Sequence, residues 1–316
     1  MYQNKLKAVF VGAVLIALVA YGFLNTDPYS SHFFIWICLN AVLAVSLRFV
    51  MLIGEINLAH ASFFGVGAYT SAVLTVHFGW PFFIAFLVSG VLTALISMLF
   101  GVIAFRLKGA YFLLVSFALA EVMRLIFENF WKEILGGHNG IIGIPKPMEA
   151  YNGFVTIIAV LIILAFYFLE KSDLGKMLMA IENSDQLARS IGIHVMKFKV
   201  LALTIASFAA GLAGSMFAHF NAVISSLDFT FLFSIMLVSF VIIGGQKSFL
   251  GPIVGTIVLS LVAEFIRGIG PYERLAYGLA IILTMLFFRD GLVGKLGQAL
   301  SMLKITVVQT RKREGA

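Results

Sequence analysis

Ionisable side chains inside apolar segments are the residues of this sequence best suited to chemistry. Glu121 and Arg124 stand three positions apart in one apolar run, and Glu264 and Arg267 repeat that spacing in another. Residues three apart share a helix face, so each pair can join helices within a membrane or stand in a polar pathway. Because each charge has a partner of opposite sign, helix pairing is favoured, and a proton or sodium relay is less attractive.

Motifs for enzymatic chemistry are absent from the sequence. It contains neither G-x-x-x-x-G-K-[ST] nor H-E-x-x-H, and it shows no plausible Ser/His/Asp arrangement. Cys38 is the single cysteine, and His138 has no ligand partners at metal-binding spacing. We therefore expect no enzyme, no metal and no cofactor, and any ATP must be hydrolysed by separate subunits.

The composition excludes a water-soluble globule. Of 316 residues, 61% are hydrophobic and only 12% are charged, against roughly 45–50% and 25% in soluble domains. The net charge of +7 does not indicate nucleic-acid binding, because the basic residues are scattered. At about 20 residues per span, the apolar runs predict an all-α polytopic membrane protein with about ten helices, at 8–24, 33–53, 57–76, 82–105, 110–131, 152–169, 200–222, 229–243, 250–268 and 273–289.

Loop charge predicts the orientation of these helices. With a cytoplasmic N-terminus, the positive-inside rule is obeyed by 17 of the 22 basic residues. These are Lys5, Lys7, Arg48, Arg106, Lys108, Lys171, Lys176, Arg189, Lys197, Lys199, Lys247, Arg289, Lys295, Lys304, Arg311, Lys312 and Arg313. Both termini are expected in the cytoplasm, with 290–316 as a basic cytoplasmic tail. The first segment resembles a signal peptide, but its length favours an uncleaved helix. For the segments 57–76 and 229–243, a re-entrant or broken helix is the alternative, because the first carries polar residues and the second is barely long enough.

An internal similarity suggests a repeat. Residues 120–126 and 263–269 share the pattern A-E-x-x-R-x-I, and Ala-Ser-Phe at 61–63 recurs at 206–208. The offsets nearly agree, so four helices per unit would give a parallel internal repeat of the kind found in some transporters. Chance similarity among apolar sequences is an equally good explanation.

The segment 54–70 places polar groups at membrane depth. Ala61, Gly65 and Ala68 would let a neighbouring helix approach closely, which indicates packing. Asn57 and His60 are less easily explained by packing, because polar groups there must face protein or water.

These motifs resemble the permease subunits of bacterial ATP-driven importers for branched-chain amino acids. The segment 54–70 looks like the family hallmark, and further matches follow in order at 107–112, 136–145, 175–193 and 243–252. The Gly-Gly-x-Asn-Gly stretch at 136–140 is similar to the M-type member of the permease pair. The resemblance implies a single permease domain over 1–316 with the fold of an ABC importer permease.

The longest polar loop, 170–199, is a candidate coupling loop on the cytoplasmic side. Its middle, 182–192, is compatible with one amphipathic helix that Gly192 could end. In the resembled family this helix docks on the ATPase subunit, whereas composition alone allows a solvated connector. The implied ATPase-coupling residues are Glu182, Asp185, Leu187, Arg189, Ile191 and Gly192.

The resemblance implies a pathway for leucine, isoleucine or valine in the bacterial inner membrane. Its partners would be a second permease, two cytoplasmic ATP-binding subunits and an extracytoplasmic binding protein, with the lipid bilayer around it. Polar candidates for the pathway are Asn57, His60, Tyr69 and Glu121. A permease for urea or short-chain amides and an ion-coupled secondary transporter are the alternatives. A passive channel is disfavoured, because no charged ring or carbonyl filter is apparent.

Overall fold

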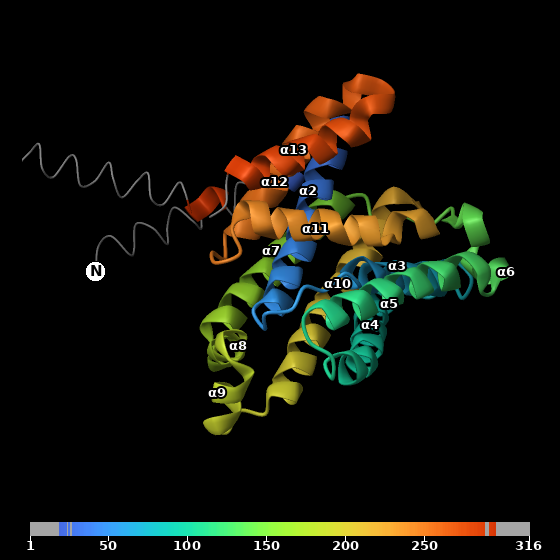
Figure 1. Ribbon diagram of the computed structural model, residues 1–316. Helices are drawn as coiled ribbons and strands as arrows, with labels where there is room; N and C mark the ends of the chain where they lie inside the picture. The colour runs from blue at the N-terminus through green and yellow to red at the C-terminus, as the bar shows by residue number, and fades with distance from the viewer. Residues whose placement is uncertain (1–18, 24, 26, 288–290, 295–316) are drawn as a thin grey trace, which may run out of the picture. The chain divides into compact units, whose positions relative to one another are not determined.

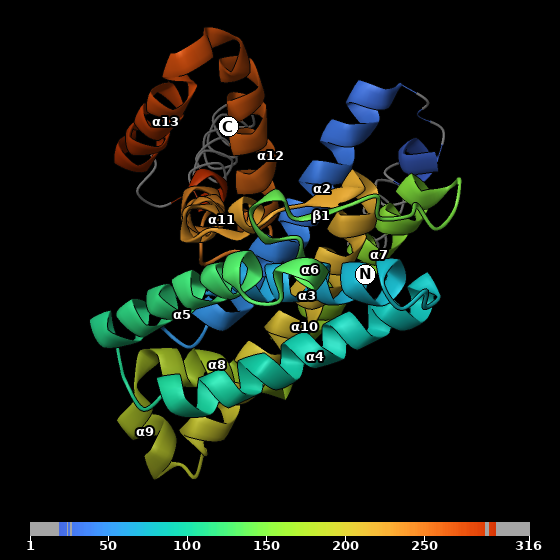
Figure 2. The same cartoon turned by 90° about the vertical axis from the view of Figure 1, so that its right-hand side faces the viewer.

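The computed structural model describes residues 19–23, 25, 27–287 and 291–294. These residues belong to two compact units, one up to Ile235 and one from Met236 onward. Nearly all regular structure is helical, as Figures 1 and 2 show. The exception among the described residues is a two-stranded sheet, so the predicted all-α class is correct apart from this short element.

Helices of the first unit surround α10. The elements in order are α2 (Pro28–Met51), α3 (His60–Val76), α4 (Phe82–Ala104), α5 (Ala110–Asn129), α6 (Lys132–Leu135), η1 (Gly137–Asn139), β1 (Ile141–Ile142), α7 (Tyr151–Lys171), α8 (Asp173–Asn183), α9 (Asp185–Ser190), α10 (Val195–Asn221), β2 (Val223–Ile224) and η2 (Ser226–Phe229). The long helix α10 packs against α2, α3 and α4, and α2 packs against α7. The next helix, α11 (Phe231–Gly244), begins in the first unit and ends in the second.

Local sequence explains where several of these elements begin. The Asp27 side chain accepts a hydrogen bond from the backbone N–H of Ser30, and Pro28 occupies the first turn of α2. An acidic N-cap followed by proline satisfies free N–H groups and pre-sets the helical φ. The 3₁₀ turn η2 begins with a capping box between Ser225 and Asp228.

Small residues set the separation of α3 and α10. A Cβ atom added to Gly214 would lie 2.0 Å from the carbonyl oxygen of Phe64, so the two backbones are in direct contact. The predicted small stripe is buried as well, with Ala61 and Ala68 enclosed and Gly65 against the rings of Phe127 and Phe229. The interpretation of this stripe as helix packing is therefore confirmed.

The connections of the first unit gather at two ends. At one end, the segments before α3, between α4 and α5, and around α9 are joined by ion pairs. At the other, β1 pairs antiparallel with β2, and the His77 ring contacts the carbonyl of Ile134 at 2.9 Å. Gly140 must be glycine here, because its φ is +72° and a Cβ would lie 1.8 Å from the Ile224 carbonyl oxygen. Helices that alternate in direction bring alternate loops together in this way.

The second unit holds α12 (Gly251–Ile266), the 3₁₀ segment η3 (Arg267–Tyr272) and α13 (Glu273–Phe287). The gap between the predicted helices 229–243 and 250–268 corresponds to the tight connection between α11 and α12. There a Cβ on Gly244 would lie 1.8 Å from the carbonyl oxygen of Gly251. α12 packs against α13.

The ten predicted spans are matched in part. Each predicted span from 33 to 287 contains a helix, and five described helices, α2, α4, α5, α7 and α10, have the length and hydropathy to cross a membrane. α3, α11, α12 and α13 have only 17, 14, 16 and 15 residues. α3, α11 and α12 are bounded by turns and 3₁₀ segments, which hydropathy does not detect. Most of 8–24 and of the 290–316 tail lies outside the described residues.

Candidate functional site

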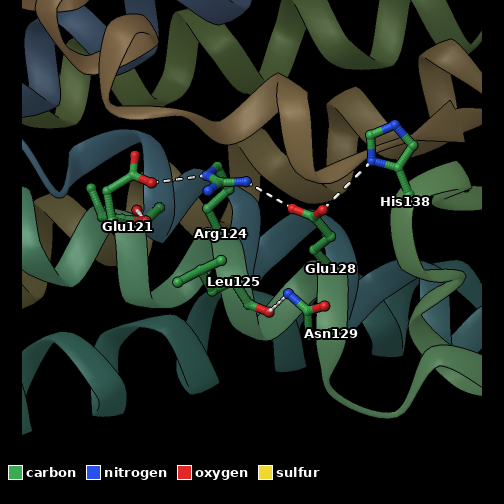
Figure 3. Close-up of polar contacts among 8 residues, drawn as sticks. Glu121, Arg124, Leu125, Glu128, Asn129 and His138 are labelled. Atoms are coloured by element: carbon green, nitrogen blue, oxygen red, sulfur yellow. Dashed lines mark hydrogen bonds and ion pairs between the residues drawn. The ribbon is translucent and has the colours of Figure 1, made fainter.

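Arg124 on α5 joins two carboxylates (Figure 3). Its Nε lies 2.9 Å from Oε2 of Glu121, and its Nη1 lies 2.7 Å from Oε2 of Glu128. His138 extends this ladder, with Nδ1 3.6 Å from Oε1 of Glu128. The predicted Glu121–Arg124 pair is therefore present. Glu128 was not singled out from the sequence, although its position four residues after Arg124 is the spacing that favours such a pair.

The ladder on α5 carries more negative than positive charge. Two carboxylates share one guanidinium, and all three side chains are about a quarter exposed. Charged groups within a membrane face protein or water rather than lipid. This face of α5 can therefore contact a polar pathway or another protein. The second predicted pair, Glu264 with Arg267, forms at 3.4 Å and is more open to solvent on the arginine side.

Asn57 and His60 lie buried where α3 begins. Asn57 Oδ1 accepts a hydrogen bond from the backbone N–H of Ala59 at 2.9 Å, and His60 Nε2 lies 2.9 Å from Oγ of Ser46 on α2. Asn57 Nδ2 has no hydrogen-bond partner among the described residues. An unpaired buried amide is costly, so it is a candidate for contact with water or solute.

Tyr69 and Glu121 complete the four predicted pathway residues. The Tyr69 ring is buried and stacked on Phe127 of α5, with ring centroids 4.3 Å apart. Three of the four residues come from α3 or the turn before it, and Glu121 comes from α5, which packs against α3. The structure therefore brings together the two helices that carry the four residues. Their role in a pathway stays a prediction.

A buried polar chain centred on His219 was not anticipated from the sequence. His219 Nδ1 lies 2.8 Å from the carbonyl oxygen of Pro145, so Nδ1 carries the proton and Nε2 is an acceptor. Ser71 Oγ, 3.0 Å away, donates to Nε2, and Ser215 Oγ donates to Ser71 at 2.7 Å. These hydrogen bonds connect α3 and α10 to the glycine-rich segment 136–145.

The coupling-loop prediction of one helix over 182–192 is corrected by the structure. Glu182 belongs to α8, and Ser184 separates α8 from α9, its Oγ accepting from the N–H of Leu187. A serine N-cap was visible in the sequence and explains the break. The predicted stop at Gly192 is confirmed. Gly192 has φ of +87°, and the bonds Gly192 N–H to Arg189 and Ile193 N–H to Ala188 form a Schellman motif.

The remaining coupling residues divide between the two faces of α9. Leu187 and Ile191 are 69% and 74% exposed, and Arg189 is also exposed. Ala188 is buried on the opposite side, and the Asp185 carboxylate faces inward to form ion pairs. Exposed apolar side chains on so short a helix suit docking against another protein. Their role in coupling stays a prediction.

Asp185 is held by two lysines. Its Oδ2 lies 2.5 Å from Nζ of Lys108, and its Oδ1 lies 3.3 Å from Nζ of Lys199. Burial raises the pKa of Asp185, but the hydrogen bonds and positive charges of Lys108 and Lys199 outweigh this effect and leave the pKa below its ordinary value. Asp185 is therefore ionised at neutral pH and anchors α9.

Lys199 also pairs with Glu55, whose Oε1 lies 3.6 Å from Nζ. Both side chains are almost fully enclosed, at 6% and 8% exposure. In the sequence, Lys108 and Lys199 entered only the count of basic residues that sets the orientation, and Glu55 gave no signal of a partner. Their association could not be read from spacing, because they come from three separate segments. No cluster of three metal-ligating side chains occurs within the described ranges.

Comparison with known proteins gives the family. Residues 29–288 match the family described as "Branched-chain amino acid transport system / permease component". The high-affinity branched-chain amino acid transport system permease protein LivM of Escherichia coli is 29% identical over 323 aligned residues, covering 91% of this chain and 75% of LivM. LivM of Salmonella typhimurium is 27% identical with the same coverage of both chains.

A more distant relative has a different substrate in its name. The ribose import permease protein RbsC of Haemophilus influenzae is 24% identical over 302 aligned residues, covering 86% of this chain and 89% of RbsC. No solved structure matches the chain. Because the family match covers most of the 316 residues, the chain belongs to the branched-chain amino acid transport system permease family.

Proposed function

We propose that this chain is the M-type permease subunit of an ABC importer that moves leucine, isoleucine or valine across a bacterial inner membrane. The family is one of transport permeases, so the chain is not catalytic. The finer substrate assignment is supported by the two LivM relatives at 27–29% identity. The ribose permease is less similar to this chain than the two LivM proteins, so ribose is the less favoured substrate.

The observation that carries the proposal is the construction of α9. Its inner face is fixed by Asp185, while Leu187 and Ile191 project outward with nothing covering them in the described chain. A short helix so anchored suits docking in a groove of another protein. Two cytoplasmic ATP-binding subunits are the partners that a permease of this family needs, with a second permease and an extracytoplasmic binding protein completing the importer.

The proposed topology has both termini in the cytoplasm and about ten membrane passages in one permease domain, 1–316. It places the coupling loop, 170–199, and the segments around Glu55 and Lys108 on the cytoplasmic side. The meeting of these segments at one end of the first unit supports their shared side. Cysteine labelling of Ser190→Cys in sealed cells, in a Cys38→Ser background, tests the side directly. Labelling by an impermeant reagent from outside would contradict the topology.

Co-purification tests the class of transporter. The chain, co-expressed with a second permease and ATP-binding subunits and solubilised in mild detergent, should retain two ATP-binding subunits. The complex should hydrolyse ATP when the substrate-loaded binding protein is added. Ion-gradient-driven uptake by the chain alone would instead establish a secondary transporter.

Competition for uptake tests the substrate. Uptake of labelled leucine by the reconstituted complex should be suppressed by excess isoleucine or valine and unaffected by urea, acetamide or ribose. Suppression by urea or acetamide, with none by valine, would overturn the amino-acid assignment.

A further inference from the structure

Lys199 occupies an enclosed position between α9 and the start of α3. It lies in the second turn of α10, and its ammonium group is 3.3 Å from Asp185 Oδ1 and 3.6 Å from Glu55 Oε1. A buried ammonium must stay paired, because loss of one partner leaves an uncompensated charge in a medium of low dielectric. Lys199 thus resists any movement that separates Asp185 from Glu55.

The contacts around Lys199 close into a ring. Glu55 Oε2 accepts a hydrogen bond from the backbone N–H of Gly109 at 3.1 Å. Lys108, the preceding residue, holds the second oxygen of Asp185 at 2.5 Å. The ring therefore runs from Lys199 through Asp185, the 108–109 peptide and Glu55 back to Lys199. It joins α9 and α10 to the connection between α4 and α5 and to the turn before α3.

The ring connects the exposed helix α9 with the start of α3. Asp185 is the first residue of α9, and Glu55 is five residues before His60, which opens α3. Asn57, whose amide nitrogen has no hydrogen-bond partner among the described residues, lies between Glu55 and His60 in the sequence. A displacement of α9 must carry the segment 55–60 with it or break buried ion pairs.

We propose that Lys199 and Asp185 are positioning residues that transmit displacement of α9 to the segment 55–60 at the start of α3. This inference rests on the proposed function, because the force on α9 would come from the ATP-binding subunits. The ring acts as a rigid link. Movement of α9 driven by ATP is therefore passed on fully to Asn57 and His60 only while the ring is intact. Neither residue need contact substrate or nucleotide.

Variants of Lys199 in the reconstituted complex test this link. Lys199→Met removes the ammonium and keeps the side-chain length, and Lys197→Met makes the same change at an exposed site on the same helix turn. The ratio of labelled leucine taken up to ATP hydrolysed should fall at least about fivefold in Lys199→Met, the low end of allosteric coupling factors. Lys197→Met should keep the wild-type ratio, and Lys199→Arg should restore most of it. A wild-type ratio in Lys199→Met would overturn the proposal.

A second variant guards against misfolding. Lys199→Met leaves Glu55 buried and unpaired, whereas Lys199→Met combined with Glu55→Gln removes both charges. The double variant should assemble normally and still couple poorly, because the direct tie through Lys199 is lost and only the path through Lys108 and Gly109 remains. Normal assembly with a wild-type ratio would contradict the link.

A measurement on the purified chain separates this inference from the proposed function. In Asp185→Asn, hydrogen exchange of backbone amides at 54–61 should accelerate. Asp173→Asn, which alters an exposed carboxylate on α8, should leave it unchanged. If the wild-type complex fails to import leucine, the proposed function fails while this exchange result still decides the link. Unchanged exchange at 54–61 in Asp185→Asn would refute it.

Discussion

Gly67 of α3 packs against Gly211 of α10 so closely that a Cβ atom added to Gly67 would lie 2.1 Å from the Gly211 carbonyl oxygen. Backbone, rather than a flexible side chain, blocks that position. The two helices can therefore keep their present separation only with glycine at Gly67.

Replacement of Gly67 by alanine should separate α3 from α10. Overpacking of a tight contact costs about 1 to 3 kcal/mol, so Gly67→Ala should lower the thermal unfolding temperature in detergent. Gly278→Ala in α13 is the matched control, because outside its own helix turn no atom of the described residues lies within 4 Å of its added Cβ. Equal unfolding temperatures for the two variants would show that the contact between α3 and α10 is looser than described.

Leu187→Asp should abolish substrate-stimulated ATP hydrolysis while membrane insertion stays intact. Leu187 is exposed on α9, so a carboxylate there disturbs nothing within the chain but opposes burial against a partner. Leu187→Met, which keeps an apolar surface, should behave as wild type. Unchanged stimulation in Leu187→Asp would remove α9 from the docking surface.

Loss of Arg124 should be more damaging than loss of either carboxylate beside it. Arg124→Met leaves Glu121 and Glu128 on one face of α5 without the cation that joins them, and a hydrogen bond to a charged group contributes about 1.5 to 3 kcal/mol. Glu128→Gln keeps the Glu121 pair and should be milder. Comparing the yield of folded protein and its thermal stability checks this order, and the reverse order would contradict the ladder in Figure 3.

His219→Ala should loosen the segment 136–145. The variant removes the donor to the Pro145 carbonyl and the acceptor for Ser71, and leaving buried groups unsatisfied costs about 1 to 3 kcal/mol. Backbone amides of 140–145 should exchange faster in the variant. His194→Ala, at an exposed site, should leave them unchanged, and equal exchange in both variants would exclude His219 as the anchor.

The anchor of α9 should withstand mild acid. The pKa of Asp185 is lower in the folded chain than its ordinary value of 3.8, so its pairing stabilises the fold above that pH and is lost as pH falls through the lowered value. A dye on Gln186→Cys, in a Cys38→Ser background, should report a constant environment from pH 5 to 8 and a change only below pH 3.8. Asp185→Asn should lack that acid transition, and its persistence would assign the transition to another group.

Hydropathy and local spacing predicted much of this structure. The positions of the helices followed from apolar runs, and the Glu121–Arg124 pair followed from its spacing on one helix. The break at Ser184 was also readable, because serine caps helices, yet amphipathic spacing across it favoured one continuous helix. Features of this kind can be predicted from the sequence because they depend on residues that are close together along the chain.

Contacts between distant segments could not be predicted in the same way. Lys108, Lys199 and Glu55 looked like ordinary charges beside apolar runs, and only the folded chain brings them together around Asp185. The strands β1 and β2 have two residues each, too few for any alternation of side chains to be visible. His219 gave no signal either, because its partners are serines on α3 and α10 and a backbone carbonyl.

ATP-driven leucine uptake tests the central claim most directly. Proteoliposomes should contain this chain, its permease partner and the ATP-binding subunits, with the binding protein outside, ATP inside and ion gradients collapsed. We predict accumulation of labelled leucine that stops when the ATP is replaced by a non-hydrolysable analogue. Accumulation that continues with the analogue, or none with ATP while labelled ribose or urea accumulates, would contradict the assignment.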